Sequence, residues 1–402
     1  MPTRFIQFHT LTPYATSLLN RDDAGFAKRI PFGGVPRTRI SSQCLKRHWR
    51  TFDGEHALDK LDAPATVRSR LTFEEHVAKP LIAAGIPAET AREVTVQIVK
   101  EILGFNAERA KAKAGKKGDD AEPQDPAVKT DQITVLGKPE LDYILAEARA
   151  ICEEVGSEQD AKKLAKSVKD HFGREGKANM QALAKGAGLS AALFGRMVTS
   201  DNLARCDAAI HVAHAFTVHA EASESEFFSA VDDLVSASGE LGSGHIGTTE
   251  VNTGLYYGYV VVDVPKLIEN LSGDTELAAA VVGELAWLMA TVSPGAKLGS
   301  TAPYAYAELV FAEAGDAQPR SLANAFMAQV TAGKQGMGAE AAAKLAGHCK
   351  RYDTMYGNAG NRALSALDAP ADLCCTLGID GAVPLADLAR WASEAVRQAE
   401  GV

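Results

Sequence analysis

Residues 21–50 read RDDAGFAKRIPFGGVPRTRISSQCLKRHWR. Eight of these thirty residues are Lys or Arg and two are acidic, so the stretch carries a formal charge of +6, whereas the whole chain of 402 residues carries −9. Positive charge gathered on one part of an acidic protein is typical of a binding site for a polyanion. Because the net charge of the chain is negative, we expect this contact with nucleic acid to be local.

The stretch also has an internal order. Gly33–Gly34 predicts a tight turn or a close approach of two backbones. Arg37 and Arg39 are two residues apart, so their side chains would share one face of an extended segment. Ser41 or Ser42 could then cap the N-terminus of a helix.

A helix that starts at this point would have two distinct faces. At about 100° per residue, three cations fall within an arc of about 100°, and three apolar residues fall within an arc of about 60° on the other side. The cations are Lys46, Arg47 and Arg50, and the apolar residues are Leu45, Trp49 and Phe52. One face can pack while the other, helped by backbone N–H groups of the helix start and the glycine turn, binds phosphate. The alternative is an ordinary solvated surface helix.

Residues 18–50, LLNRDDAGFAKRIPFGGVPRTRISSQCLKRHWR, closely resemble the N-terminal signature of the CasC family. CasC is the backbone subunit of the type I-E CRISPR Cascade complex and belongs to the RAMP superfamily. Its signature joins an N-R-D-D loop, F-G-G, a basic extended segment and R-I-S-S-Q-x-L-K-R-x-x-R. Shorter matches follow over most of the chain, at Gly195–Met197 with Thr199–Ser200, Ala230–Leu234, His245–Thr248, Pro294–Lys297 and Leu322–Phe326.

The resemblance implies an α+β fold: a modified ferredoxin-like (RRM-like) palm with a helical fingers domain and a projecting thumb loop. The palm would comprise residues 1–55 and 181–402, with the thumb at about 221–250. The fingers would be a mainly helical insertion at 56–180. Within it, the polar segment 106–131 has almost no long aliphatic side chains, so we expect it to be flexible.

The same resemblance implies a non-catalytic subunit that polymerises along CRISPR RNA and helps present this guide to target DNA in antiviral defence. Its partners would be the CRISPR RNA, target DNA, neighbouring copies of itself and other Cascade subunits. The predicted RNA-binding residues of the cationic stretch are Arg21, Lys28, Arg37, Arg39, Ser41, Ser42, Gln43, Lys46, Arg47 and Arg50. The resemblance adds Met197, Phe228, Val231, His245 and Lys297.

Three of these added residues are apolar, and a core position is the ordinary interpretation of an apolar residue at helical spacing. The resemblance instead places Met197, and Phe228 with Val231, to wedge between bases of the guide. Such a wedge costs a few kcal/mol of unstacking, which the phosphate contacts must offset. It reads no sequence, because every base has a π-face, so sequence recognition is left to pairing between guide and target.

Regular structure is expected to interleave strands and helices along the chain, which favours an α/β or α+β class. Apolar runs predict strands at 5–11, 208–220, 251–264 and near 305–313. The segment from 12 to 34 is expected to be a loop. Helical spacing predicts helices within 56–104 and near 139–154, 158–171, 178–194, 265–292, 321–331 and 385–399.

Bulk properties indicate a cytoplasmic protein without a membrane segment. The N-terminus lacks the apolar segment of a signal peptide, and no apolar run reaches the 18 residues of a membrane span. The six cysteines include no C-x-x-C pair, so we expect reduced thiols, no metal and no cofactor.

The alternative function is a metal-dependent ribonuclease of the RAMP superfamily. Asp22–Asp23 would supply paired carboxylates for metal-assisted hydrolysis, although two adjacent acids in a loop are a weak signal. His211, His214 and His219 form H-x2-H-x4-H. On a strand, His211 and His219 share a face and His214 takes the other, which is poor geometry for one metal. Hydrogen-bonded core histidines are the favoured interpretation.

Overall fold

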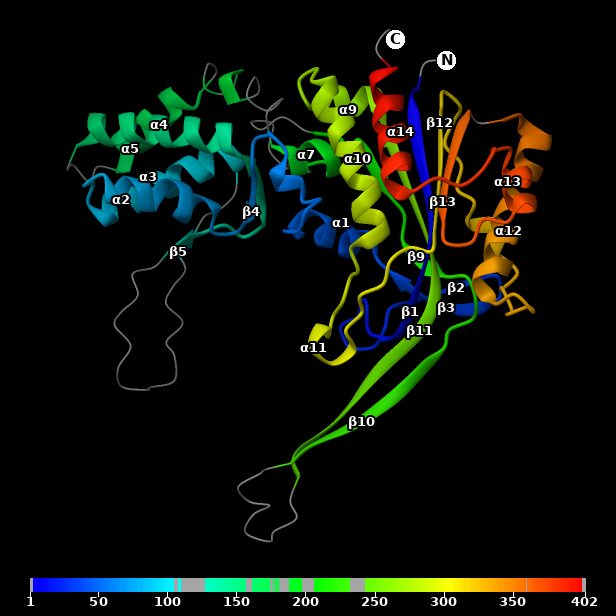
Figure 1. Ribbon diagram of the computed structural model, residues 1–402. Coiled ribbons are helices and arrows are strands. Elements are labelled where there is room, and N and C mark those ends of the chain that lie inside the picture. The colour runs from blue at the N-terminus through cyan, green and yellow to red at the C-terminus, as the bar shows by residue number, and fades with distance from the viewer. Residues whose placement is uncertain are drawn as a thin grey trace. The chain divides into compact units, whose positions relative to one another are not determined.

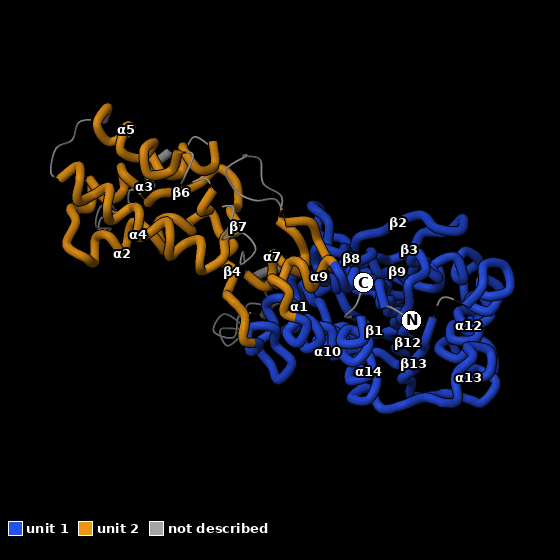
Figure 2. The backbone as a smooth tube through the Cα atoms, turned by 90° about the horizontal axis from the view of Figure 1, so that it is seen from above, with its two compact units in different colours: residues 1–61, 210–265, 275–402 blue, residues 62–209, 266–274 orange. Residues whose placement is uncertain are grey.

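The computed structural model describes residues 3–104, 108–109, 127–156, 161–173, 176, 178–180, 188–196, 206–231, 243–358 and 360–399. The chain forms two compact units (Figure 2). Unit 1 comprises residues 1–61, 210–265 and 275–402, and unit 2 comprises residues 62–209 and 266–274. No helix among the described residues is long and apolar enough to cross a membrane.

Unit 1 is built on an antiparallel sheet, which has nine strands in its described part (Figure 1). Seven strands follow the order β13-β12-β1-β11-β9-β3-β2, and β8 and β10 also pair with β11. The strands are β1 (Phe5–Ser17), β2 (Arg29–Phe32), β3 (Val35–Ile40), β8 (Ile210–Val212), β9 (Ala215–Thr217), β10 (Ser223–Val231), β11 (Ser243–Asp263), β12 (Leu309–Gly315) and β13 (Asn361–Ala366). This sheet with its helices confirms the mixed α+β class.

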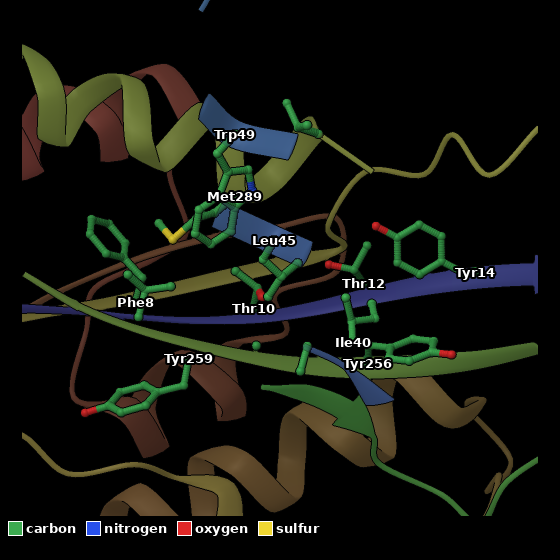
Figure 3. Close-up of a pocket in the computed structure, with 14 residues that line it drawn as sticks. Phe8, Thr10, Thr12, Tyr14, Ile40, Leu45, Trp49, Tyr256, Tyr259 and Met289 are labelled. Carbon is green, nitrogen blue, oxygen red and sulfur yellow. The ribbon is translucent and has the colours of Figure 1, made fainter. Parts of the chain in front are cut away.

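Helices cover both faces of the sheet. On one side, Phe8 and Thr10 of β1 line a cavity of about 40 Å³ with Trp49 and Met289 (Figure 3), enough for about one water molecule. Leu11 alternates to the other side, where it packs in the cluster that includes residues of the helices at 337–356 and 371–377. The unit 1 helices are α1 (Ser42–Thr51), η1 (Leu58–Lys60), α10 (Thr275–Thr291), α11 (Leu298–Thr301), η4 (Ala323–Phe326), α12 (Met337–Tyr356), α13 (Ala371–Leu377) and α14 (Leu385–Arg397).

Several strands differ from the expectation. β1 runs on to Ser17 rather than ending at residue 11, and β2 lies within the segment 12–34 that was expected to be a loop, whereas β3 coincides with the extended segment expected around Arg37 and Arg39. The single strand expected at 208–220 is two short strands, β8 and β9. The segment predicted to be the thumb loop, 221–250, forms a ribbon of β10 paired with β11 in its described part, because the glycine-containing arm hydrogen-bonds along its length to the preceding segment. We call this pair of strands the thumb ribbon.

Unit 2 is mainly helical in its described part and has its own core. Val94, Ile98 and Ile102, whose spacing predicted a helix, are buried there with Ile144 and Ile151. Its elements are β4 (Thr66–Ser69), η2 (Glu74–Ala78), α2 (Lys79–Ala83), α3 (Ala88–Leu103), β5 (Glu108–Arg109), β6 (Val128–Lys129), β7 (Thr134–Gly137), α4 (Lys138–Val155), α5 (Ala161–His171) and α7 (Leu189–Phe194), and α9 (Val264–Asn270) spans the boundary of the two units.

The boundary of unit 2 lies beyond the predicted end of the fingers at residue 180. Leu189 donates a backbone hydrogen bond to Pro64 (3.0 Å), and the buried Arg196 pairs with Glu140 at 2.7 Å. These contacts hold residues 188–196 against the helical unit. The flexible segment predicted at 106–131 falls mostly outside the described residues.

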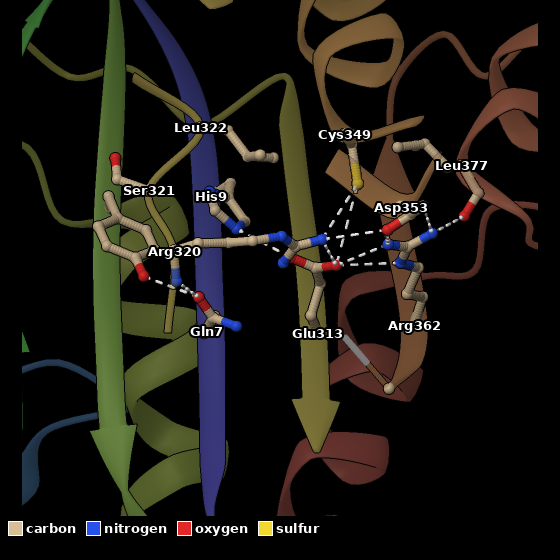
Figure 4. Close-up of polar contacts among 12 residues, drawn as sticks. Gln7, His9, Glu313, Arg320, Ser321, Leu322, Cys349, Asp353, Arg362 and Leu377 are labelled. Carbon is tan, nitrogen blue, oxygen red and sulfur yellow. Dashed lines mark hydrogen bonds and ion pairs between the residues drawn. The ribbon is translucent and has the colours of Figure 1, made fainter. Parts of the chain in front are cut away.

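A buried network of charges crosses the sheet of unit 1 (Figure 4). The carboxylate of Glu313 on β12 has no exposed surface, and it lies 3.5 Å from His9, 2.8 Å from Arg320 and 3.0 Å from Arg362. Both arginines also pair with Asp353 of α12. Burial alone would raise the pKa of Glu313, but the hydrogen bonds and charges of His9 and Arg320 outweigh it and lower this pKa to about 2. Burial lowers the pKa of His9.

We expect acidification to destabilise unit 1 through both groups. Below a pH of about 6.5, His9 gains a proton more readily in the unfolded chain than in the fold, so stability decreases. The contribution of Glu313 is present above pH 4.5 and disappears as the pH falls towards about 2. Urea unfolding of the protein at pH 7.5, 5.5 and 4 should therefore show falling midpoints.

A variant separates this network from general acid sensitivity. Glu313→Gln should lose about 3–5 kcal/mol of unfolding free energy at neutral pH, because it removes the negative charge that Arg320 and Arg362 share in the largely buried network. Asp387→Asn, at an exposed pair with Arg390, should change it by less than about 1 kcal/mol. Equal midpoints for the two variants would contradict the central role of Glu313.

Candidate nucleic-acid interface

The turn of the β2–β3 hairpin is Gly33–Gly34. Both residues have positive φ, +62° and +83°, which residues with a side chain rarely adopt. A Cβ on Gly33 would lie 1.7 Å from the backbone oxygen of Met327. The turn and the close backbone approach predicted from the sequence are thus both present at this position.

The structure contradicts the prediction that Arg37 binds RNA. Its side chain is fully buried and donates hydrogen bonds to the backbone carbonyls of Phe32 (3.2 Å), Thr217 (3.0 Å) and Phe326 (2.9 Å). Burial lowers the pKa of this guanidinium. Arg37 therefore joins β2, β9 and η4 inside the unit, where no phosphate can reach it.

Arg39 remains partly exposed two residues further along β3. Its Nη1 lies 2.8 Å from Nδ1 of His214, and its Nε donates to the carbonyl of Arg29 at 3.2 Å. Burial, together with the charges of Arg39 and Lys28, lowers the pKa of His214. A neutral His214 can accept this hydrogen bond, which orients Arg39 at the surface.

The loop that precedes β2 is shaped by Asp22. Its Oδ1 accepts hydrogen bonds from the backbone N–H groups of Ala24 and Phe26, both at 3.0 Å. This turn leaves Arg21 exposed and Lys28 half-buried. The carboxylate suggested for the alternative ribonuclease thus has a structural task in the loop.

Helix α1 begins with Ser41 as its N-cap, which decides between the two candidate serines. The Ser41 hydroxyl accepts a hydrogen bond from the backbone N–H of Cys44 (3.3 Å), and the Ser41 N–H donates to the side chain of Asn20 (2.9 Å). Ser41 itself is buried, so its visible role is to start the helix. Ser42 is the first residue of α1.

The expected two faces of α1 are present over Ser42–Thr51, while Phe52 of the expected apolar face follows the helix as its C-cap. Trp49 is buried, and Leu45 packs against the cluster around Tyr14 and Ile40. The polar residues reach the surface to different degrees: Gln43 and Arg47 are exposed, and Ser42, Lys46 and Arg50 are half-buried. Burial lowers the pKa of Lys46.

The thumb ribbon carries two aromatic rings on opposite faces. Phe227 and Phe228 are 65% and 41% exposed, and their cross-strand partners are Thr248 and Gly247. The ring of Phe228 covers Gly247, where a Cβ would lie 2.5 Å from its Cζ. Nζ of Lys297 lies 5.6 Å from the centre of the same ring. The structure therefore brings together two predicted RNA-binding residues that are far apart in the sequence.

The remaining predicted RNA-binding residues are Val231, His245 and Met197. Val231 is the last residue of β10 and His245 lies in β11, so both belong to the thumb ribbon by their backbones. Met197 lies outside the described residues.

Two further cationic features were not singled out from the sequence. Arg29 of β2 pairs with Glu221 and Glu250 rather than facing solvent alone. On α5 of unit 2, four exposed lysines recur at helical spacing, a K-K-x-x-K-x-x-K pattern that the sequence could have revealed: Lys162, Lys163, Lys166 and Lys169.

The three histidines do not form a metal site. Nε2 of His219 accepts a hydrogen bond from the backbone N–H of Leu255 (3.1 Å), while Nδ1 donates to the carbonyl of Ala220 (2.7 Å). His211 and His214 are exposed and His219 is half-buried, so none of the three is a fully buried core histidine, and the hydrogen bonds of His219 come closest to that interpretation. No group of three or more potential ligand residues in the described part of the chain is placed to hold a metal ion.

Comparison with known proteins shows the family to which this chain belongs. The profile of the CT1975-like protein family matches residues 6–391. The chain belongs to the family of CT1975-like proteins. No curated protein sequence matches this CT1975-like protein.

Two solved structures share its fold. A chain described as "CRISPR RNA-guided surveillance complex, pre-nicking" is 27% identical, with a TM-score of 0.75 over 97% of this chain and 100% of that one. A second, described as "CRISPR RNA-guided surveillance complex", is 24% identical, with a TM-score of 0.65 over 96% and 99%. The expected likeness to CRISPR-associated proteins is thus confirmed at the level of the family and the fold.

We predict that this CT1975-like protein binds guide RNA through the cationic face of α1. Lys46→Ala with Arg50→Ala should weaken binding about equally for all spacer sequences and flatten the slope of log K against log[salt] by roughly one to two units. Filter binding at 50–300 mM salt measures the slope. Arg390→Ala on α14, whose side chain is 74% exposed, is the control and should leave it unchanged. An unchanged slope in the double variant would remove α1 from the contacts.

We also predict a wedge role for Phe228. Phe228→Ala should lower guide affinity by only about 1–3 kcal/mol per stacked base, since stacking is lost but the phosphate contacts remain. Target engagement should suffer more, since the guide can slide without the wedge. Chemical probing of the assembled wild type should show reactive guide bases at a constant interval. The same interval and intensity in the variant would place the wedge elsewhere, with Met197 the next candidate.

Proposed function

We propose that this protein is a non-catalytic, guide-RNA-binding backbone subunit of a type I-E CRISPR surveillance complex. Copies of it would polymerise along the CRISPR RNA, assemble with the other Cascade subunits, and help present the guide to target DNA.

One observation carries the proposal: the chain is similar over nearly its full length to a chain of an RNA-guided surveillance complex, and that chain is covered completely. A partial match would be compatible with a shared domain in a different context. Here the sheet unit, the thumb ribbon and the helical unit all fall within the matched length, so the likeness extends to the parts that would contact a guide.

The geometry of unit 1 supports contact with RNA. Arg47 and Arg21 are exposed, and Lys28, Arg39, Lys46 and Arg50 are half-buried, so several cations of one short stretch reach the surface. Guanidinium and ammonium groups would neutralise guide phosphates without reading bases. This suits a subunit that must accept any spacer sequence, since base pairing then supplies the specificity.

The thumb and α5 support the remaining parts of the proposal. A ribbon with one exposed ring on each face can touch the guide and a neighbouring copy at the same time. The lysines of α5 offer unit 2 a second cationic surface, suited to the phosphates of target DNA.

Co-purification tests the proposal directly. The protein should be isolated from cells that carry a CRISPR array, and the bound RNA should be sized and sequenced. We expect guide-length RNA with mixed spacers and a particle much larger than one chain of 42.5 kDa. A monomer free of RNA under these conditions would contradict it.

We predict that the protein does not cleave its guide. Wild type and Asp22→Ala should leave labelled guide RNA equally intact in the presence of Mg²⁺, because the Asp22 carboxylate already holds the loop backbone. Denaturing gels follow the RNA. Cleavage by the wild type that disappears in Asp22→Ala would favour the metal-dependent ribonuclease instead.

A further inference from the structure

One guanidinium joins both strands at the base of the thumb. Arg29 lies on β2, within the cationic stretch. Its Nε donates to Oε1 of Glu221, which lies two residues before the start of β10, and its Nη2 donates to Oε1 of Glu250 on β11. A single side chain thus bridges the chain entering the thumb and the chain leaving it.

The surroundings of this bridge are mostly closed to solvent. The side chains of Glu221 and Glu250 are 12% and 5% exposed, and that of Arg29 is 39% exposed. The second oxygen of Glu250 accepts a hydrogen bond from the backbone N–H of Ala27 (3.1 Å). The backbone N–H of Glu221 donates to Pro36 at 2.9 Å. The thumb base and the β2–β3 region are therefore held together on both strands.

This arrangement argues against Arg29 as a phosphate ligand. The hydrogen bond to Glu221 is the main cause that raises the pKa of the Arg29 guanidinium, and Glu250 raises it further. The cation and the two carboxylates therefore stabilise one another. A phosphate that captured Arg29 would leave Glu250 buried and without its cation. Removal of one partner from a buried charge pair costs more than the pair contributes.

We propose that Arg29 is a positioning residue: a clamp that fixes the angle at which the thumb leaves the sheet, and thereby the place of Phe228. The clamp itself follows from the contacts of the free protein, and its effect on the guide rests on the proposed function. Lys cannot replace Arg here, because its single terminal nitrogen cannot bridge two carboxylates in the planar geometry of a guanidinium.

Hydrogen exchange of the free, full-length protein tests the clamp. In Arg29→Ala and Arg29→Lys, amides of residues 223–228 and 247–252 should exchange at least about ten-fold faster than in the wild type. Glu221→Gln should give a smaller increase, because it preserves shape and removes one charge. Arg47→Ala, an exposed cation of the same stretch, should match the wild type. Wild-type exchange in both Arg29 variants would overturn the clamp, and wild-type exchange in Arg29→Lys alone would overturn the requirement for bridging.

Guide binding separates a clamp from a phosphate contact. The salt slope of Arg29→Ala should equal that of the wild type, while the regular interval of reactive guide bases blurs. A slope flattened by about one unit would identify Arg29 as a phosphate ligand and overturn the proposal. If the wild type binds no guide, the proposed function fails, and hydrogen exchange still decides whether the clamp exists.

Discussion

The carboxylate of Glu313 has no exposed surface, yet it carries a full negative charge because Arg320 and Arg362 lie within 3.0 Å. Asp353 of α12 completes the network, so β12, β13, α12 and the segment before η4 must all be in place for any of these charges to be tolerated. An unpaired buried charge is far more costly than an unmade apolar contact. The network therefore restricts how the helices can pack on this face of the sheet.

The same physical requirement extends from the network to the candidate interface. Arg320 leads directly into Leu322, whose backbone N–H donates to the hydroxyl of the buried Tyr257 (3.1 Å). The chain continues to the carbonyl of Phe326, which accepts a hydrogen bond from Arg37 of β3. A series of buried polar groups thus connects the centre of unit 1 with the hairpin that precedes α1. A buried polar group that lost its hydrogen-bond partner here would be left unsatisfied, which is costly.

Arginine performs two different tasks in this protein. Arg37, Arg320 and Arg362 are held by carbonyls or carboxylates inside unit 1, where the planar guanidinium satisfies several acceptors at once. Arg21 and Arg47 are exposed and keep their charge available to a polyanion. Arg29 stands between these groups, since it is partly exposed but engaged by two acids at the thumb base. The charge of a stretch therefore overstates the charge that it offers to a ligand.

Much of the fold and part of the site could be predicted from the sequence, because the relevant signals are local. A Gly-Gly pair can adopt the positive φ of a tight turn, as Gly33–Gly34 does. A serine before an amphipathic run caps a helix, and the apolar spacing of Leu45 and Trp49 defines a buried face. The resemblance of the N-terminal stretch to a known family was also local, and the family match agrees with it at a coarser level. The strand limits were less predictable, since strands are completed by partners far along the chain, as β10 and the glycine-containing arm of β11 are.

The tertiary structure alone decided which charges are available. Arg37 and Arg39 are two arginines of one short strand, and the sequence offers no reason to treat them differently. Arg37 is buried because it donates hydrogen bonds to the carbonyls of Thr217 and Phe326, which lie far away in the chain. The sequence around Glu313 does not indicate that Arg320 and Arg362 will neutralise its charge. Nor does the sequence indicate that Lys297 will lie beside Phe228. The sequence by itself determined the turn at Gly33–Gly34, the start and buried face of α1, the cationic content of residues 21–50 and a mixture of strands and helices of the α/β or α+β class. The division of those cations into a buried Arg37, an Arg29 that bridges two acids, and exposed charges was decided by long-range packing, because burial and electrostatic pairing depend on residues that only the fold brings together.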